Sequence, residues 1–320
     1  MCGWLRGLAR LAVALLGSAA ALASASVLHV CDDRDKANAA QQDRQLRFAA
    51  VVRERLQASQ ADIAIVSRAG LALGRFGMRY SHAGFSVRRP ADPATPAWAV
   101  RQLYFDCTEA RPRLFDQGLS AFVLGAEQPD AGWLSVLLLP QREAAALARA
   151  VMDDALASGL LHPRYSANAY AWALDFQNCN QWVAEMLAAA WAVPGSSISE
   201  ASGPAGERAR AQAWLRDAGY EPAVFELRSP AVLLAGMFVP WIHSRDHPSA
   251  DVDALRYRVS MPAAIEAFVQ RQHPATRRIE FCYTPERIVT RENGPPLGET
   301  CAAGPQDREI LFQPPNTAAR

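Results

Sequence analysis

The chain has 320 residues, half of them hydrophobic, which is enough to bury a substantial core in one domain or in two small ones. Its 33 lysines and arginines nearly balance its 32 aspartates and glutamates. Such a balance produces no strong electrostatic field for nucleic acid or for an anionic membrane, and no nucleic-acid-binding motif is present. We therefore expect no nucleic-acid partner.

The N-terminal residues have the pattern of a secretory signal peptide. Arg6 and Arg10 precede an apolar run over residues 11–25, which ends in the small residues Ala-Ser-Ala. The run is shorter than the roughly 18 residues of a membrane span, and no later apolar run is long enough. We therefore predict a signal peptide over residues 1–25, no transmembrane segment in the mature chain, and a periplasmic or secreted protein.

Beyond the signal peptide, the apolar periodicity predicts a mixture of helices and strands. The proline-rich link at residues 90–96 joins the second and third strands as a hairpin, and residues 231–241 are apolar but interrupted by Gly236 and Pro240, which indicates a buried or interfacial segment. In chain order, we predict a helix at 44–56, strands at 61–66, 80–87, 98–105 and 133–139, helices at 142–156, 179–191, 207–218 and 262–269, and a strand at 278–283.

The best candidate for a domain boundary is a loop rich in serine, glycine and proline at residues 196–206. It separates a first domain, over residues 26–195, from a loop-rich C-terminal extension over residues 196–320. We expect the extension to pack on the first domain. The mixture of helices with a strand hairpin predicts a protein of the α+β class.

The functional interpretation depends on the stretch around Cys179. Asn178 is a good N-cap, and the apolar residues beyond it recur with helical spacing. Cys179 then lies in the first helical turn, where free backbone N–H groups and the helix dipole favour a thiolate. The alternative is a small buried hydrophobic residue, which is the commoner role of a cysteine.

The cysteine count supports a free thiol. Six cysteines are present, and Cys2 leaves with the signal peptide, so five remain. In an oxidising compartment, an odd cysteine is partnered elsewhere or is a free thiol. If Cys179 is the free one, the other four can form two disulfides in any of three pairings: Cys31, Cys107, Cys282 and Cys301.

His82 is the candidate base for the Cys179 thiol. In the predicted hairpin, even-numbered side chains share one face of the sheet, so Gln102 lies across from His82. Gln102 is therefore our candidate for the group that orients the imidazole, and Asp106 is the second candidate. A strand histidine with a satisfied hydrogen bond and a surface glutamine are the alternatives.

Three segments resemble a known family when taken in their order along the chain. They are residues 62–70 (DIAIVSRAG), residues 80–85 (YSHAGF) and residues 178–183 (NCNQWV). They resemble the circularly permuted branch of the papain-like NlpC/P60 superfamily and, more narrowly, the DUF2145 family of uncharacterised bacterial proteins. In such permuted members, the histidine strand comes before the nucleophilic cysteine at a helix start. The resemblance covers residues 45–190.

The resemblance implies a papain-like core, with an antiparallel sheet packed against the helix that carries Cys179. It also implies a cysteine hydrolase of the amidase or peptidase type that acts on peptides, cell-wall peptides in particular. A thiolate attacks the carbonyl, and an imidazole takes the thiol proton and returns it to the leaving group. Two alternatives stay open: a lipid ester hydrolase or acyltransferase, and a non-catalytic envelope binding or scaffold protein. We expect no cofactor, and the oligomeric state stays open.

A metal site is the weaker alternative. His243 and His247 are four residues apart, a spacing that can bind zinc on a helix. Pro240 and Pro248 flank the pair closely, and no glutamate follows the first histidine. We therefore interpret this segment as a solvated loop and expect no bound metal.

Overall fold

The structure of the protein is a computed structural model, which describes residues 37–71, 73–89, 97–124, 129–192, 204–230, 239 and 241–312. The predicted signal peptide, Cys31, the link at 90–96 and most of the apolar segment 231–241 lie outside the described residues. Within those ranges, none of the helices has the length and apolar character that crossing a bilayer requires.

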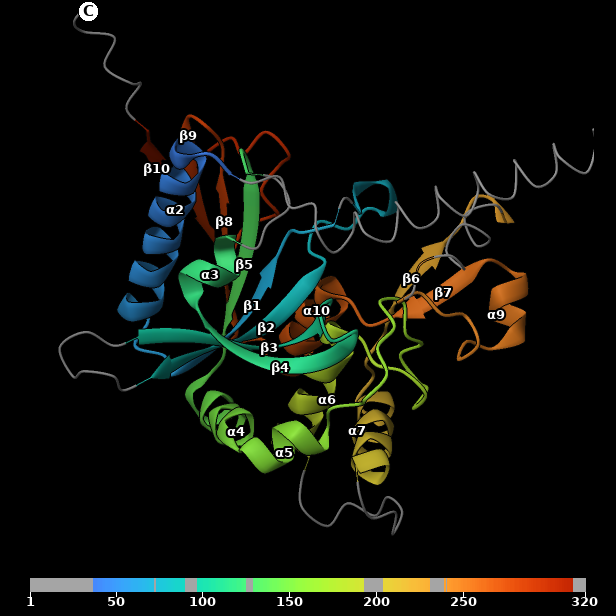
Figure 1. Cartoon of the computed structure of the whole chain (residues 1–320). Helices are drawn as coiled ribbons and strands as arrows, with labels where there is room; N and C mark the ends of the chain where they lie inside the picture. Colours follow the sequence, from blue (N-terminus) through green and yellow to red (C-terminus); the bar gives the residue numbers. More distant parts are fainter. Residues whose placement is uncertain are drawn as a thin grey trace, which may run out of the picture.

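An eight-stranded antiparallel sheet forms the centre of the fold, with strand order β10-β9-β8-β5-β1-β2-β3-β4 (Figure 1). A second, two-stranded sheet pairs β6 (Ala223–Glu226) with β7 (Arg256–Val259). The α+β class is therefore confirmed. The strands of the large sheet are β1 (Ile63–Arg68), β2 (His82–Arg89), β3 (Ala97–Asp106), β4 (Arg111–Gly118), β5 (Gly132–Leu138), β8 (Arg277–Tyr283), β9 (Arg287–Glu292) and β10 (Arg308–Leu311).

Helices cover both faces of the large sheet (Figure 1). On one face lie α2 (Ala39–Ala58) and α3 (Leu119–Leu124). Because β1 is central, both of its faces are buried: Ile63 and Ile65 pack toward α6, and Ala64 and Val66 toward α2. The other face carries α4 (Gln141–Met152), α5 (Asp154–Gly159), α6 (Cys179–Trp191), α7 (Pro204–Asp217) and α10 (Pro262–Gln272).

The first helix begins five residues earlier than the apolar pattern predicts. Asn38 and Gln41 form a capping box, in which the Asn38 side chain accepts from the Gln41 N–H at 3.0 Å and the Gln41 side chain accepts from the Asn38 N–H at 2.8 Å. This reciprocal pair satisfies two backbone donors that the helix itself leaves free. The polar first turn of α2 is therefore set by its cap and not by burial.

The C-terminal residues complete the large sheet. β8 pairs with β5, β9 with β8 and β10 with β9, all antiparallel. From the same part of the chain, α7 and α10 contribute buried side chains to the core around α6. Where we expected a loop-rich extension beyond residue 196, the structure has three strands of the large sheet and two helices of its core. The small helix α9 (Ser249–Asp253) lies beside β7 in this region.

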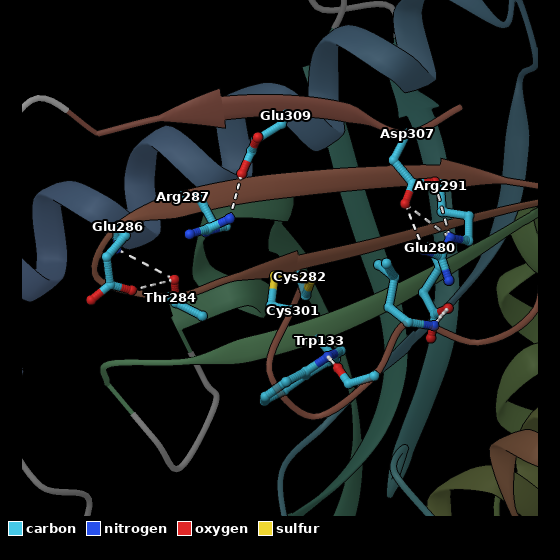
Figure 2. The surroundings of a disulfide bond; sticks show 12 residues. Trp133, Glu280, Cys282, Thr284, Glu286, Arg287, Arg291, Cys301, Asp307 and Glu309 are labelled. Carbon is cyan, nitrogen blue, oxygen red and sulfur yellow. Dashed lines mark hydrogen bonds and ion pairs between the residues drawn. A yellow bond between two sulfur atoms is a disulfide. The ribbon is translucent and has the colours of Figure 1, made fainter. Parts of the chain in front are cut away.

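A disulfide connects Cys282 on β8 to Cys301 (Figure 2). Cys107 is likewise disulfide-bonded. Cys179 is a free thiol. The indole of Trp133 packs beside the Cys282–Cys301 bridge and donates to the Gly298 carbonyl oxygen at 3.3 Å. The bridge and the indole together hold the loop that follows β9.

We expect the double variant Cys282→Ala/Cys301→Ala to lower the free energy of unfolding by about 3 kcal/mol, because the bridge restricts a short loop in the unfolded chain. The two cysteines are 19 residues apart in sequence. Urea denaturation of the wild type and the variant under non-reducing conditions measures the difference. A loss below about 1 kcal/mol would show that the loop is held by its other contacts.

Candidate functional site

The start of α6 positions Cys179. The Asn178 side chain accepts from the Gln181 N–H at 2.7 Å, which caps the helix one residue before the cysteine. The helix is buried on nearly every side because other helices and the sheet surround it. Cys179 itself is 6% exposed. The predicted N-cap and helix start are therefore confirmed.

The loop before Cys179 is held by a buried ion pair. Arg208 of α7 lies 2.9 Å from Glu185 of α6, and both side chains are almost completely buried. The same guanidinium donates to the Leu174 and Phe176 carbonyl oxygens, each at 3.1 Å. Two glutamine amides complete the network on the Glu185 carboxylate, those of Gln177 at 2.7 Å and Gln212 at 2.9 Å.

Asn180 connects the start of α6 to the strand that carries His82. Its Oδ1 accepts from the Ala83 N–H at 3.0 Å, and its Nδ2 donates to the Ser81 carbonyl oxygen at 3.1 Å. The pairing of β2 with β3 stops at Phe85, so the asparagine occupies the place of a strand partner at Ala83. The main chain on both sides of His82 is therefore bonded to the residue next to Cys179.

The structure brings His82 and Gln102 together. His82 is the first residue of β2, and its Nε2 is hydrogen-bonded to the Gln102 Oε1. Because an amide oxygen can only accept, Nε2 is the donor, and Nδ1 carries the lone pair of the neutral ring. The rings of Tyr104 and Phe122 flank the imidazole, with centroids 5.8 and 6.0 Å away.

The thiol and the imidazole belong to opposite faces of the sheet. His82 and Gln102 lie on the face that α3 covers, and Cys179 packs in the core around α6. The two faces meet at the end of β2, where β3 no longer pairs with it and α6 begins. In the part of the chain that the structure describes, the two residues are linked through Asn180 and not by a direct hydrogen bond.

Burial keeps both groups neutral in the resting protein. It raises the pKa of the Cys179 thiol to about 11, against the opposing effects of the Asn180 N–H, the Tyr165 hydroxyl and the Arg68 charge. Burial also lowers the pKa of His82 to about 3; the nearby Arg68 acts in the same direction, and the Gln102 hydrogen bond opposes it. The backbone N–H groups at the helix start thus lower the pKa of the thiol, as expected, but burial raises this pKa by more.

Tyr165 is a site residue for which no sequence pattern provides a signal. It lies in the loop before α6, where its main chain forms an isolated β-bridge with Gln177. Its hydroxyl is hydrogen-bonded to the Cys179 thiol. Burial and the neighbouring thiol raise the pKa of this phenol well above its usual range. The hydroxyl is therefore a neutral donor beside the sulfur at any physiological pH.

A cavity of about 240 Å³ opens beside Cys179 and Asn180. Its wall also includes Tyr165 and Ser81, the neighbour of His82 in the chain. Other parts of the wall come from the 3₁₀ helix η1 (Gly74–Phe76) and the segment before it, from β6, β7 and the residues just after them, and from residues 167–168 and 242–244. The free thiol therefore faces a space that a small molecule can enter.

Two further sequence-based candidates have other roles in the structure. The Asp106 carboxylate accepts from the Thr108 and Glu109 N–H groups and so forms the turn after β3, whereas Gln102 contacts the imidazole. The segment around His243 and His247 is a turn, but our interpretation of it as a solvated loop was wrong for His247. That ring is buried between tyrosine rings and bonds to a main-chain oxygen at 2.8 Å.

The fold and this site define an α+β protein with a free, buried thiol at a helix start, connected to a histidine–glutamine pair on the adjacent strands. The chain belongs to the family of uncharacterized proteins conserved in bacteria, DUF2145, whose model matches residues 55–269. The match includes Cys179, His82 and Gln102 and continues past the boundary expected near residue 200. No curated protein and no solved structure matches the chain.

Proposed function

We propose that this protein is an exported cysteine hydrolase of the amidase or peptidase type, built on a permuted papain-like arrangement. Cys179 is the nucleophile, His82 is the base and then the acid, and Gln102 is the positioning residue for the imidazole. The observation that carries the proposal is the pair of Asn180 hydrogen bonds, which holds the start of the cysteine helix against both neighbours of His82.

The reaction begins from the neutral thiol and the neutral imidazole. The proposal requires the Cys179 sulfur and His82 Nδ1 to approach each other at the end of β2, where the two faces of the sheet meet. As the sulfur then attacks the substrate carbonyl carbon, its proton passes to His82 Nδ1, and the charged ring is held by its Nε2 hydrogen bond to Gln102. The backbone N–H groups of the first helical turn and the Tyr165 hydroxyl are donors for the oxyanion. His82 then protonates the leaving group, and a water molecule hydrolyses the acyl-thioester.

Neutrality of the resting pair fits this order of events. Burial penalises a thiolate or an imidazolium that forms alone. When the proton moves from one group to the other, both charges form together and stabilise each other. The proton transfer is therefore tied to the attack on the substrate, and the free thiol reacts slowly in its absence.

A non-catalytic binding protein on the same scaffold is the second candidate function. The raised pKa of Cys179 and the absence of a direct thiol–imidazole hydrogen bond among the described residues favour it. In that case the cavity holds a ligand beside an inert thiol. The two functions differ in whether an acyl group is ever transferred to the sulfur.

The test compares wild type with Cys179→Ser, His82→Gln and Gln102→Leu. Purified mature protein is incubated with activated acyl donors such as p-nitrophenyl esters, and the Cys179 peptide is examined by mass spectrometry for the added acyl group. We expect acylation to disappear in Cys179→Ser, to fall by about 10²–10⁴-fold in His82→Gln, and to fall less in Gln102→Leu. A donor that binds without ever acylating the wild-type sulfur would establish the binding protein instead.

A further inference from the structure

The cavity beside Cys179 has a wall made mainly of hydrocarbon. Val259 and Met261 are buried and belong to a small hydrophobic cluster, against which Leu73, Phe225 and Leu227 of the wall pack. This cluster lies between the two-stranded sheet and the segment that leads into η1. The proposal below depends on the apolar side chains of this wall, which are those of Leu73, Phe76, Phe225, Leu227, Val259 and Met261.

The polar side chains of the wall already have hydrogen-bond partners inside the protein. A peptide placed in the cavity would therefore bring N–H and C=O groups that find few free partners there, and this weakens binding. A hydrocarbon chain has no such groups. The existing bonds are those of Asn180 with the Ser81 and Ala83 main chain, Asn168 with the His243 main chain, Ser81 with the Leu71 N–H and Ser244 with the Tyr257 hydroxyl.

The exposed residues of the wall mark where a chain enters. Leu71 contributes to the cavity and is half exposed. Among the wall residues that the structure describes, Arg75 alone carries a permanent charge, and it is exposed with its guanidinium 4.8 Å from the Phe76 ring centroid. The interior of the cavity is therefore apolar, and charge is confined to its outer edge.

We propose that the acyl part of the substrate is an unbranched hydrocarbon chain that occupies this cavity, with its carbonyl carbon at Cys179. The proposal rests on the proposed function and names its substrate class: a fatty acyl amide or ester, and not a peptide on the acyl side. The sulfur–carbon bond forms as the bond to the leaving group breaks, and the thiol proton leaves with that group through His82. Water then releases the fatty acid and restores the thiol.

The first arm of the test measures kcat/KM for p-nitrophenyl esters from acetyl to decanoyl. We expect a rise of about fourfold for each added methylene until the chain fills the cavity, because each methylene leaves water. Leu227→Trp, or Leu73→Trp should the first not fold, fills part of the cavity and lowers the octanoyl-to-acetyl ratio of kcat/KM to near one. The matched control is Val224→Trp, which lies on β6 beside Phe225, is exposed and lies outside the wall, so the preference stays.

The second arm measures alkylation of Cys179 by N-methylmaleimide and N-octylmaleimide, which requires the thiol and the cavity but no hydrolysis. We expect the octyl compound to react at least tenfold faster in wild type and to lose this advantage in Leu227→Trp. Equal rates of hydrolysis for all chain lengths, or faster acylation by an N-acetylalanyl ester, would contradict the proposed hydrocarbon substrate. Neither result would contradict the proposed hydrolase function. Octyl preference without any hydrolysis supports the cavity and overturns the proposed function.

Discussion

We expect Glu185→Ala to lower the free energy of unfolding by about 3–5 kcal/mol, because it leaves the Arg208 guanidinium buried without its counter-charge. Both side chains are almost completely buried, and Gln177 and Gln212 also lose an acceptor. Denaturant unfolding followed by tryptophan fluorescence measures the loss.

The matched control for Glu185→Ala is Asp43→Ala. Asp43 pairs with Arg47 at 2.9 Å on the surface of α2, with about 60% of each side chain exposed. An exposed pair of this kind contributes at most about 1 kcal/mol, so the control changes little. If Glu185→Ala and Asp43→Ala prove equally mild, the buried network is not what holds the loop before Cys179. The double variant Glu185→Leu/Arg208→Met, which removes both charges, should recover part of the loss.

We expect His82→Gln to make the protein less sensitive to acid. The pKa of His82 is about 3 in the folded protein, because the ring is buried, and about 6.5 in the unfolded chain. Below pH 6.5 the unfolded chain therefore binds a proton that the folded protein does not bind. As the pH falls below 6.5, the free energy of unfolding of the wild type decreases by about 1.4 kcal/mol per pH unit because of this residue. The contribution of the neutral His82 ring to stability is fully present only above pH 6.5.

The measurement compares unfolding free energies of wild type and His82→Gln between about pH 7 and pH 4.5. We expect the stability advantage of the wild type to shrink by about 2.5 kcal/mol over this range. His243→Gln is the control, because that ring is only partly buried and burial lowers its pKa less than that of His82. Parallel acid curves for wild type and His82→Gln would contradict the buried, neutral imidazole.

Local patterns in the sequence predict the parts of the site that lie on regular elements. The alternation along the hairpin is enough to place Gln102 on the same face as His82, since strand periodicity fixes which side chains share a face. The register of β2 with β3 puts Gln102 opposite Gly84, so its side chain reaches His82 diagonally. The cap and the apolar periodicity after Asn178 are enough to place Cys179 at a helix start. Both are consequences of short-range geometry.

The contacts that join these elements could not be predicted from the sequence. Arg208 and Glu185 are 23 residues apart and on different helices, so no local pattern pairs them. Asn180 reaches the main chain of β2, and main-chain contacts leave no side-chain signal at the far end. The effect of burial on the thiol could not be predicted for a related reason: the burial that raises the pKa of Cys179 depends on elements from the whole chain.

The C-terminal strands were underestimated because their sequences are largely polar. Charged residues lie at both ends of β9 and at the start of β10. They form ion pairs, as between Arg287 and Glu309 of the two strands, or between Arg291 and Asp307 just before β10 (Figure 2). The apolar run in each strand is only two residues long, residues 288–289 in β9 and 310–311 in β10, which is too short to predict a strand. Their position in the sheet becomes evident only from the pairing of β8 with β5.

Because β5 lies between β1 and β8, the large sheet cannot be completed until β8 has been synthesised. A nascent or truncated chain that ends near residue 195 already contains β1 and β5, but the other side of β5 has no strand to pair with. An open edge of buried, apolar sequence is a template for association with other chains. The protein therefore depends on its last hundred residues to avoid aggregation while it folds, well after the residues of the candidate site have been synthesised.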